Sequence, residues 1–516
     1  MKQDNYKWMV LITVMIGTLM SSLDSSIVNV SLPSMMADFG VGIDDIEWTI
    51  TGYMLSFAVF MPVTTYLRSR IGGRNLYLAS LLIFTIGSVL CGMAWNLGAL
   101  VAARVLQAVG GGAIIPSAMT MITEVFPKHE RGQAIGYWGV GAICGPAFGP
   151  TVGGYLTDWF GWRSIFMVNL PIGIIGMTVA MAFLQKDGGD KKSAGMFDGW
   201  GFAFLSVFLV SFLLGLSKGD HEGWTSAYII TCFTLSLFSF IGFLTVEFQV
   251  TKPIMDLDLL KSPVFAACFI LTIIRSVALY GGTFLLPLFL QRQMGLDEIT
   301  TGLILLPGSL AIGVVMPVAG KISDRIGPRL LSMAGLFFIA QFMFMYRHLD
   351  TTTSIYDIIM PTMVRGLGVG LLIAPVTATA MNAVSHEKQA MASSMLNLIQ
   401  QVSGSLGIGV LATILNVRTH FHLGVLGGNL NLSSLETQQR IAQMAHHAMD
   451  IGLTHAEAKI SSMVVLMQNI ASTAVVNAYQ DAFIAAGALT VLSIFAAFLL
   501  PNSPSALPEG EAIIME

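Results

Sequence analysis

"GYWGVGAICGPAFGPTVGGYL" covers residues 136–156 and lies within a long apolar segment. Four of its glycines recur at intervals of four residues, at Gly141, Gly145, Gly149 and Gly153. Glycine and proline disfavour the interior of a helix in water. In a bilayer, glycines at this spacing form a flat face on which another helix can approach closely, and neighbouring helices satisfy the carbonyls that proline frees. The stretch therefore predicts a membrane-spanning helix in close contact with a neighbour.

The composition also indicates a membrane protein. Of the 516 residues, 54% are hydrophobic and 11% are charged, whereas a soluble domain is nearer a quarter charged. The mean hydropathy is +0.73. The net charge of −4 offers no basic surface for nucleic acid. The four cysteines form no CxxC pair and the histidines supply no ligand set at metal-site spacing, so neither a disulfide framework nor a metal site is predicted.

Fourteen apolar segments are long enough to cross a bilayer, which takes about 20 residues. The predicted spans lie at about 8–32, 46–67, 76–95, 98–121, 133–156, 164–185, 198–217, 225–246, 263–290, 300–319, 329–347, 354–380, 392–415 and 477–501. The N-terminal segment leads into the first span without a small-residue cleavage site. We therefore interpret it as a spanning helix rather than a removed signal.

Lysine and arginine set the orientation of these spans. With the N-terminus in the cytoplasm, 16 of the 26 fall on the inner side, 7 on the outer side and 3 within spans. This bias predicts that both termini are cytoplasmic and that the long connection at about 416–476 is external. The second part of that connection is half apolar, "AKISSMVVLMQNIASTAVV". It predicts a helix on the membrane surface or against the protein.

Short motifs repeat at a nearly constant offset. "RIGGR" at 70–74 follows the second span and "RIGPR" at 325–329 follows the tenth, 255 residues later. "HER" at 129–131 and "HEK" at 386–388 lie 257 apart. An arginine also lies inside the fourth and the twelfth span, at an offset of 261. The order of these matches predicts two related six-helix halves, an arrangement common among secondary transporters.

The repeat divides the chain into three parts. We predict an N-terminal six-helix bundle at 1–186, an inserted pair of helices at 187–262, and a C-terminal six-helix bundle at 263–516 that includes the external loop. The inserted pair is bracketed by the polar run "QKDGGDKKSAG" and by "EFQVTKP".

Ionisable side chains inside the bilayer are functional candidates, because burying them costs several kcal/mol. Asp24 is the acid that falls well inside a predicted span, and Arg104 lies at a compatible depth in the fourth. Burial favours a neutral carboxyl and a nearby arginine favours a carboxylate. Asp24 is therefore predicted to bind and release a proton. The structural alternative is a carboxylate fixed by Ser21, Ser25 or a facing amide, and for Arg104 a role in tying backbone carbonyls together.

Two further arginines lie within predicted spans. Arg365 is the counterpart of Arg104 in the second half, and a structural role is the favoured interpretation there. Arg275 has no evident acidic partner, and we interpret it as a cavity charge that could attract anionic substrates. The chain has no GxxxxGK[ST] sequence, so a P-loop for ATP is excluded. It also lacks a nucleophile, metal or cofactor constellation, so an enzyme is not predicted.

The motifs of this chain resemble those of the major facilitator superfamily. The GxxxDRxGxR pattern resembles its loop signature, with Gly320, Asp324, Arg325, Gly327 and Arg329 in place. The opening stretch fits its antiporter motif without a gap, at Gly136, Gly145, Gly149, Pro150, Gly153 and Gly154. The segments "LDSSIVNVSLPSM" (23–35) and "WRSIFMVNLPIGI" (162–174) resemble signatures of its fourteen-helix drug:proton antiporters of the EmrB/QacA type, and the long outer loop is closer to EmrB.

The first-half loop departs from this pattern. Ser69 stands where the family often has Asp, and Thr65 stands where it often has Gly. The resemblance therefore does not carry the charge contact of this loop over to the first half.

The resemblance implies an all-α integral membrane protein of the cytoplasmic membrane, with two pseudo-symmetric bundles plus two inserted helices. It implies a proton-driven exporter of lipophilic compounds without a cofactor, in which Asp24 and Arg104 couple the proton and the glycine stretch is a flexing seam. If the host has an outer membrane, it also implies a periplasmic adaptor and an outer-membrane channel as partners. Export of one physiological solute (a lipid, a fatty acid or a siderophore) remains an alternative. A sensor or scaffold without transport is less favoured.

Overall fold

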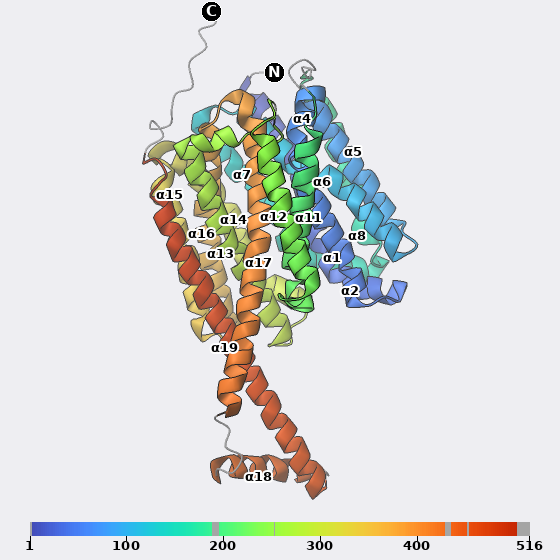
Figure 1. The fold of residues 1–516 in the computed structure, drawn as a ribbon, viewed down its shortest axis with the longest axis vertical. Helices are drawn as coiled ribbons and strands as arrows, with labels where there is room; N and C mark the ends of the chain where they lie inside the picture. Colours follow the sequence, from blue (N-terminus) through green and yellow to red (C-terminus); the bar gives the residue numbers. More distant parts are fainter. Residues whose placement is uncertain (1–2, 188–195, 252, 429–434, 451–453, 503–516) are drawn as a thin grey trace, which may run out of the picture.

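The structure, a computed structural model, describes residues 3–187, 196–251, 253–428, 435–450 and 454–502. These residues form long helices that run side by side, and none of them lies in a strand. α1 begins and α19 ends at the same end of the molecule, which we call the inner end (Figure 1). The lysine and arginine bias predicts that this end faces the cytoplasm.

Twelve stretches of the described chain are long and apolar enough to cross a membrane. They belong to α1 (Gln3–Phe39), α5 (Gly73–Gly92), α6 (Leu97–Val125), α8 with α9 (Ser164–Met167 and Asn169–Phe183), α11 (Gly199–Glu222), α12 (Ala227–Glu247), α13 (Pro263–Arg292), α14 (Glu298–Ile326), α15 (Pro328–Met345), α16 (Ile355–Asn382), α17 (Gln389–Gly428) and α19 (His455–Ala497). A bent segment adds a thirteenth, formed by α2 (Ile43–Ile46), α3 (Trp48–Phe60) and α4 (Val63–Ile71).

The bend in this segment measures 55° and falls at Met61–Pro62, where proline removes a backbone donor. The remaining predicted span, 133–156, is the 30-residue helix α7 (Arg131–Phe160). Short 3₁₀ turns precede or follow several spans, at η1 (Lys128–Glu130), η2 (Leu257–Lys261), η3 (Tyr346–His348) and η4 (His386–Lys388). Each of the fourteen predicted spans thus falls on a helix or on a broken helix.

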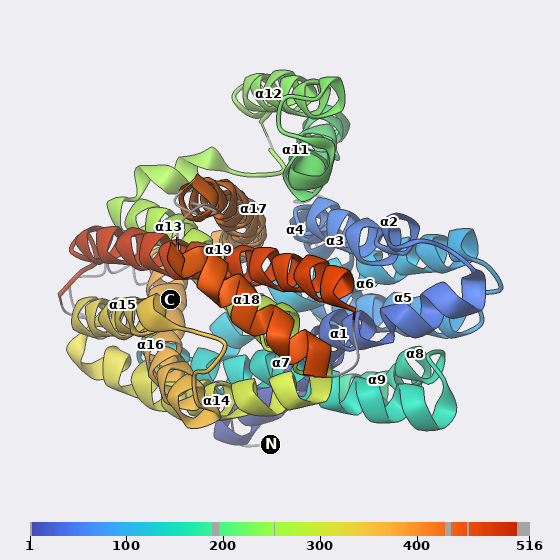
Figure 2. The same cartoon turned by 90° about the horizontal axis from the view of Figure 1, so that it is seen from below.

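The helices gather in two groups with a pair at their flank. Seen from the end opposite the inner end, α1 to α6, α8 and α9 lie on one side and α13, α15, α16 and α17 on the other, while α18 crosses in front of the middle (Figure 2). α11 and α12 lie outside both groups, where the two meet (Figure 2). α11 packs against α12, α3 and α17, so the inserted pair contacts both groups through one of its helices.

α7 packs between α1 and α14, and its glycines explain how closely α1 approaches it. A Cβ atom at Gly145 would overlap the backbone of Ser22, and one at Gly149 would overlap the Ser26 hydroxyl. Gly153 faces Ile27 of α1, and a Cβ atom there would lie 2.8 Å from the Ile27 side chain. The Ser26 hydroxyl donates to the Gly145 carbonyl at 2.9 Å. The predicted flat glycine face is therefore present, and α1 lies on it.

Other positions of the same motif face α14. A Cβ atom at Gly136 would lie 2.5 Å from the Cα atom of Pro317. One at Gly154 would lie 3.3 Å from Ile299, and Pro150 also faces α14. α7 thus carries two contact faces rather than the one that its four-residue spacing predicts, and they join helices from the two groups.

The predicted external connection forms a helical projection. α17 has 40 residues and α19 has 43, and a 43-residue helix is about 65 Å long at 1.5 Å per residue. Both extend beyond the bundle, with α18 (Leu435–Asp450) across their tip (Figure 1). Asp481 of α19 accepts hydrogen bonds from Arg418 and His422 of α17, each at 2.6 Å.

The expected position of the helix in this connection was wrong. Residues 458–476 are helical, as predicted, but they do not form a separate helix that lies on the membrane or against the protein. They continue without a break into the last span, because no proline or other helix-breaking sequence separates them from it.

Candidate functional site

Asp24 is fully buried at the centre of a polar site inside the first group of helices. Arg104 on α6 donates from Nη1 to Asp24 Oδ2 at 2.6 Å. Gln107 on α6 and Asn169 on α9 donate from their side-chain amides to Asp24 Oδ1, each at 2.8 Å. The carboxylate is therefore held by one charged group and two neutral donors, which together satisfy both of its oxygens.

α6 positions two of these partners by its periodicity. Arg104 and Gln107 are three residues apart, so they lie on one face of the helix. Nη1 of Arg104 also donates to Oε1 of Gln107 at 2.7 Å, which turns the amide nitrogen of Gln107 toward Asp24. Nε of Arg104 lies 3.4 Å from the carbonyl oxygen of Thr49 and donates to it.

The third partner is fixed from a further helix. Asn169 Nδ2 also donates to the Ser88 hydroxyl on α5 at 2.9 Å, and Ser88 donates to the Phe166 carbonyl at 2.9 Å. The Arg104 guanidinium lies 4.1 Å from the ring centre of Tyr53, which covers the charge with an apolar surface. Five spanning segments thus meet at one ionised pair.

Sequence reasoning identified Asp24 and Arg104 but missed Gln107 and Asn169. The facing amide considered as an alternative is present twice, whereas the Ser25 hydroxyl donates instead to the Ser22 carbonyl. Two signals were available. Gln107 follows Arg104 at helical spacing, and Asn169 stands inside "WRSIFMVNLPIGI".

The second group contains an incomplete copy of this pair. Arg365 donates to the Thr283 hydroxyl at 3.1 Å and lies 5.8 Å from the ring centre of Phe342. Thr283 follows Asp24 by 259 residues, close to the offset of 261 between the arginines. The copy therefore keeps the arginine and replaces the acid with a neutral hydroxyl.

Arg275 is also buried, and no acid among the described residues forms an ion pair with it. It is 2% exposed and donates from Nη2 to Gln400 Oε1 at 3.1 Å. Gln400 in turn donates to the Tyr280 hydroxyl at 2.9 Å. The Nε and Nη1 atoms of Arg275 have no hydrogen-bond partner among the described residues.

The loop motif joins the two groups at the inner end. Asp324, near the end of α14, accepts from the backbone N–H groups of Gly132 and Gln133 at 3.0 Å each. These are the first residues of α7, where a carboxylate also meets the positive end of the helix dipole. Gly320 fits against the backbone of Gly132, which leaves no room for a Cβ atom.

The other residues of the loop motif act within the second group. Gly327 ends α14 with φ +95°, a conformation that favours glycine. Arg329 donates from Nε to the Leu500 carbonyl at 2.6 Å and so ties α15 to the end of the last span. Arg325 is exposed.

The first-half loop makes a different contact, as its departure from the motif suggests. Ser69 donates to the Tyr66 carbonyl of its own helix at 2.8 Å. The groups are joined nearby by Thr64 and Ser394, whose hydroxyls lie 2.8 Å apart. Arg131 adds a bond to the Asn382 side chain at 2.8 Å. At the first-half loop, two neutral hydroxyls thus join the groups, whereas Asp324 joins them at the second-half loop.

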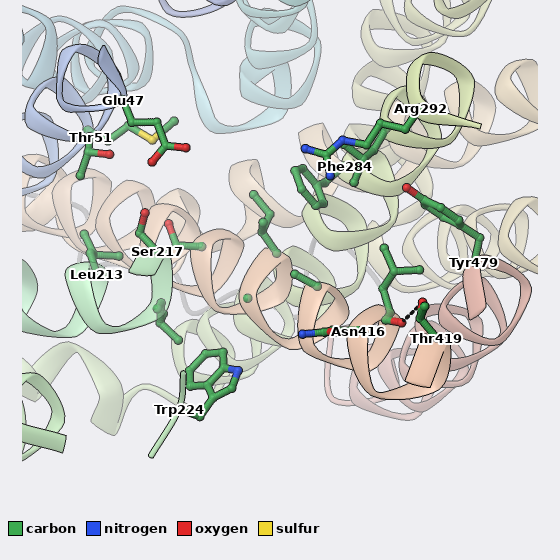
Figure 3. Close-up of a pocket in the computed structure, with 18 of the residues that line it drawn as sticks. Glu47, Thr51, Leu213, Ser217, Trp224, Phe284, Arg292, Asn416, Thr419 and Tyr479 are labelled. Carbon is green, nitrogen blue, oxygen red and sulfur yellow. Dashed lines mark hydrogen bonds between the residues drawn. The ribbon is translucent and has the colours of Figure 1, made fainter. Parts of the chain in front are cut away.

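A cavity of ≈ 700 Å³ opens between the two groups of helices, toward the end of the molecule opposite the inner end. Its walls come from α3 with the preceding Glu47, from α11, α13, α17 and α19, and from Trp224 after α11 (Figure 3). Asp24, Arg104, Arg275 and Arg365 are not among the residues that line it. The sealed ion pair and the cavity are therefore separate parts of the structure.

Comparisons with known proteins agree with this arrangement. The family model described as "Major Facilitator Superfamily" matches residues 14–408. The chain is 32% identical over 406 residues to multidrug resistance protein Stp of Mycobacterium tuberculosis, which covers 78% of this chain and 75% of that protein. It is also 32% identical over 402 residues to riboflavin transporter RibZ of Clostridioides difficile, which covers 78% and 86%.

A solved structure supports the fold independently of sequence identity. The structure of the human organic anion transporter MFSD10 aligns with a TM-score of 0.60, over 95% of this chain and 99% of that one, at 12% identity. At that identity the likeness concerns the fold alone, and it confirms the predicted all-helical architecture. The chain belongs to the major facilitator superfamily, whose members are multi-pass membrane transporters and not enzymes.

Proposed function

We propose that this protein is a proton-coupled exporter of hydrophobic and amphipathic compounds. The observation that carries the proposal is the buried Asp24 carboxylate, shared by Arg104, Gln107 and Asn169. A scaffold or a simple pore has no need of such a group. Removing one partner of a buried ion pair costs about 3–5 kcal/mol. A proton on Asp24 leaves Arg104 without its anionic partner, and so weakens the contacts between the helices that meet at the site.

The proposed coupling follows from this energy. A proton on Asp24 neutralises the carboxylate and leaves Arg104 with Gln107 and the Thr49 carbonyl as partners. α1 then loses its strongest attraction to α6 and is free to move relative to α7 on the glycine face. Because α7 also contacts α14, such a movement reaches the second group. We propose this path as the link between protonation and opening.

The structure supports alternating access because its two ends differ. The inner end is joined across the groups by Asp324, by Thr64 with Ser394, and by Arg131 with Asn382. The cavity lies toward the other end. A transporter that is closed at one end has this arrangement. Protonation of Asp24 would drive its exchange with the state that is open at the inner end.

The proposal includes a broad range of substrates. Similarity to multidrug resistance protein Stp favours many lipophilic substrates. Similarity to riboflavin transporter RibZ favours the alternative of one physiological solute. Competition for binding by chemically unrelated compounds would support the first, and tight binding of one compound alone would support the second.

The test is substrate-induced proton release from purified protein in detergent, followed from mildly acidic to mildly alkaline pH. The panel contains lipophilic cations, uncouplers and acidic quinolones. We expect the wild type to release protons on adding a ligand and Asp24→Asn to release none while it still binds. Asp44→Asn is the control, because Asp44 is exposed. Unchanged release by Asp24→Asn would place the proton site elsewhere, and no release by either protein despite binding would overturn antiport.

A further inference from the structure

We propose that the cavity selects amphipathic organic anions and that Arg292 binds their anionic group. This inference rests on the proposed export function and names the substrate class of the same cavity.

The unpaired charge that lines the cavity is positive. Glu47 and Arg292 are its charged lining residues in the described chain. Glu47 is already paired, because Lys218 on α11 lies 2.9 Å from its carboxylate. Arg292 is exposed, and no carboxylate among the described residues pairs with it. Its guanidinium is thus the uncompensated charge that a ligand meets.

The apolar wall places the body of a ligand beside this charge. Phe284, Leu288 and Arg292 follow one another at four-residue spacing on α13, so they lie along one face of the helix. Figure 3 shows Arg292 beside Phe284, across the gap from Glu47. Trp224 contributes a second aromatic surface on the other side. A ligand with an apolar body and one anionic end fits this order of groups.

A second cation on α13 adds to the same field. Arg275 is buried, and its hydrogen-bond chain runs through Gln400 to Tyr280. Tyr280 lies one turn from Phe284, so this chain of hydrogen bonds ends one turn away from a residue that lines the cavity. Charges act over longer distances in a medium of low dielectric constant. Asp24 does not offset this field, because Arg104 already neutralises it.

These charges favour one ligand class over another. A lipophilic cation would enter a cavity in which the acid is already paired and the free charge is positive. An organic anion would instead gain a charge-assisted contact with a guanidinium, whose planar donors suit carboxylates, sulfonates and phosphates. The cavity is therefore selective by the sign of the charge and permissive toward the shape of the apolar body.

The experiment compares two probes that differ in charge and share the same body, naphthylbutanoate and naphthylbutylammonium. Their binding to the purified full-length protein is measured by isothermal titration calorimetry at neutral pH. We expect the anion to bind about 10-fold more tightly than the cation, the equivalent of about 1.4 kcal/mol. In Arg292→Gln the two probes should bind equally. Arg292→Lys should keep part of the preference, because it keeps the charge and loses the planar donors.

A third variant tests the opposite wall. Glu47→Gln removes the acid and leaves Lys218 unpaired, so the preference for the anion should increase. Thermal unfolding serves as the control for the folding of Arg292→Gln. Its midpoint should equal that of the wild type, because the Arg292 side chain is exposed. Equal binding of the probes by the wild type, or an anion preference that survives in Arg292→Gln, would overturn the inference.

Failure of the inference is distinguishable from failure of the proposed function. The binding measurement needs no gradient and no proton carrier, so Asp24→Asn should retain the anion preference. If ligands release protons through Asp24 but the wild type does not prefer the anion, the inference is wrong and the transport mechanism stands. If the preference depends on Arg292 but no ligand releases protons, the cavity assignment stands and proton coupling is wrong.

Discussion

Single side chains decide whether Asp24 is a fixed charge or an exchangeable one. Arg104 supplies the positive charge, and the amides of Gln107 and Asn169 each donate a hydrogen bond to Oδ1 of Asp24. A donor that bonds to the charged form of an acid stabilises that form. Asn169 is itself held by Ser88, so its amide is oriented before any proton arrives.

Removing one amide should therefore favour protonation. In Asn169→Ala, Asp24 loses a hydrogen bond to a charged group, which is worth about 1.5–3 kcal/mol when buried. The midpoint of substrate-induced proton release should therefore differ from that of the wild type. The measurement is the proton-release assay repeated across pH. Ser25→Ala is the control, because Ser25 is exposed and bonds to its own helix. An unchanged midpoint in Asn169→Ala would mean that Asn169 is only structural.

At the scale of helices, α7 is the element on which the arrangement depends. It seats α1 on one face and α14 on another, and both contacts rely on the absence of side chains. Close approach of backbones is a main source of helix association in a bilayer, where lipid removes the usual hydrophobic driving force.

A methyl group on this face should separate the helices where the facing helix is too close and be tolerated where there is room for it. Gly145→Ala would overlap the backbone of Ser22, whereas a Cβ at Gly141 lies 3.4 Å from its nearest neighbour. Overpacking of this kind costs about 1–3 kcal/mol. Thermal unfolding in detergent should show a lower midpoint for Gly145→Ala and a nearly unchanged one for Gly141→Ala. Equal midpoints would show that α1 and α7 are not tightly packed in solution.

At the scale of the whole molecule, the spans and the buried pair of Asp24 and Arg104 could be predicted from the sequence, because each leaves a local signal. Apolar length marks a span, and an acid inside it is conspicuous. The cavity was not predictable, since Glu47, Arg292 and Trp224 are far apart in the chain and meet only after folding. The position of residues 458–476 was wrong because composition predicts a helix but not whether it continues into the next span.

The asymmetry between the two ends leads to a last prediction. Asp324 joins α14 to the start of α7 through two backbone N–H groups, and hydrogen bonds to charged groups are worth about 1.5–3 kcal/mol each. Asp324→Ala should shift the population toward the state that is open at the inner end, by about 10-fold for each 1.4 kcal/mol lost.

Pairs of spin labels at the inner ends of α4 and α17 would report this shift as a longer distance in double electron–electron resonance. Arg325→Ala is the matched control, because it removes the neighbouring charge of the same motif from an exposed position. A distance distribution in Asp324→Ala identical to that of the wild type would show that the remaining contacts, Thr64 with Ser394 and Arg131 with Asn382, are enough to hold this end closed.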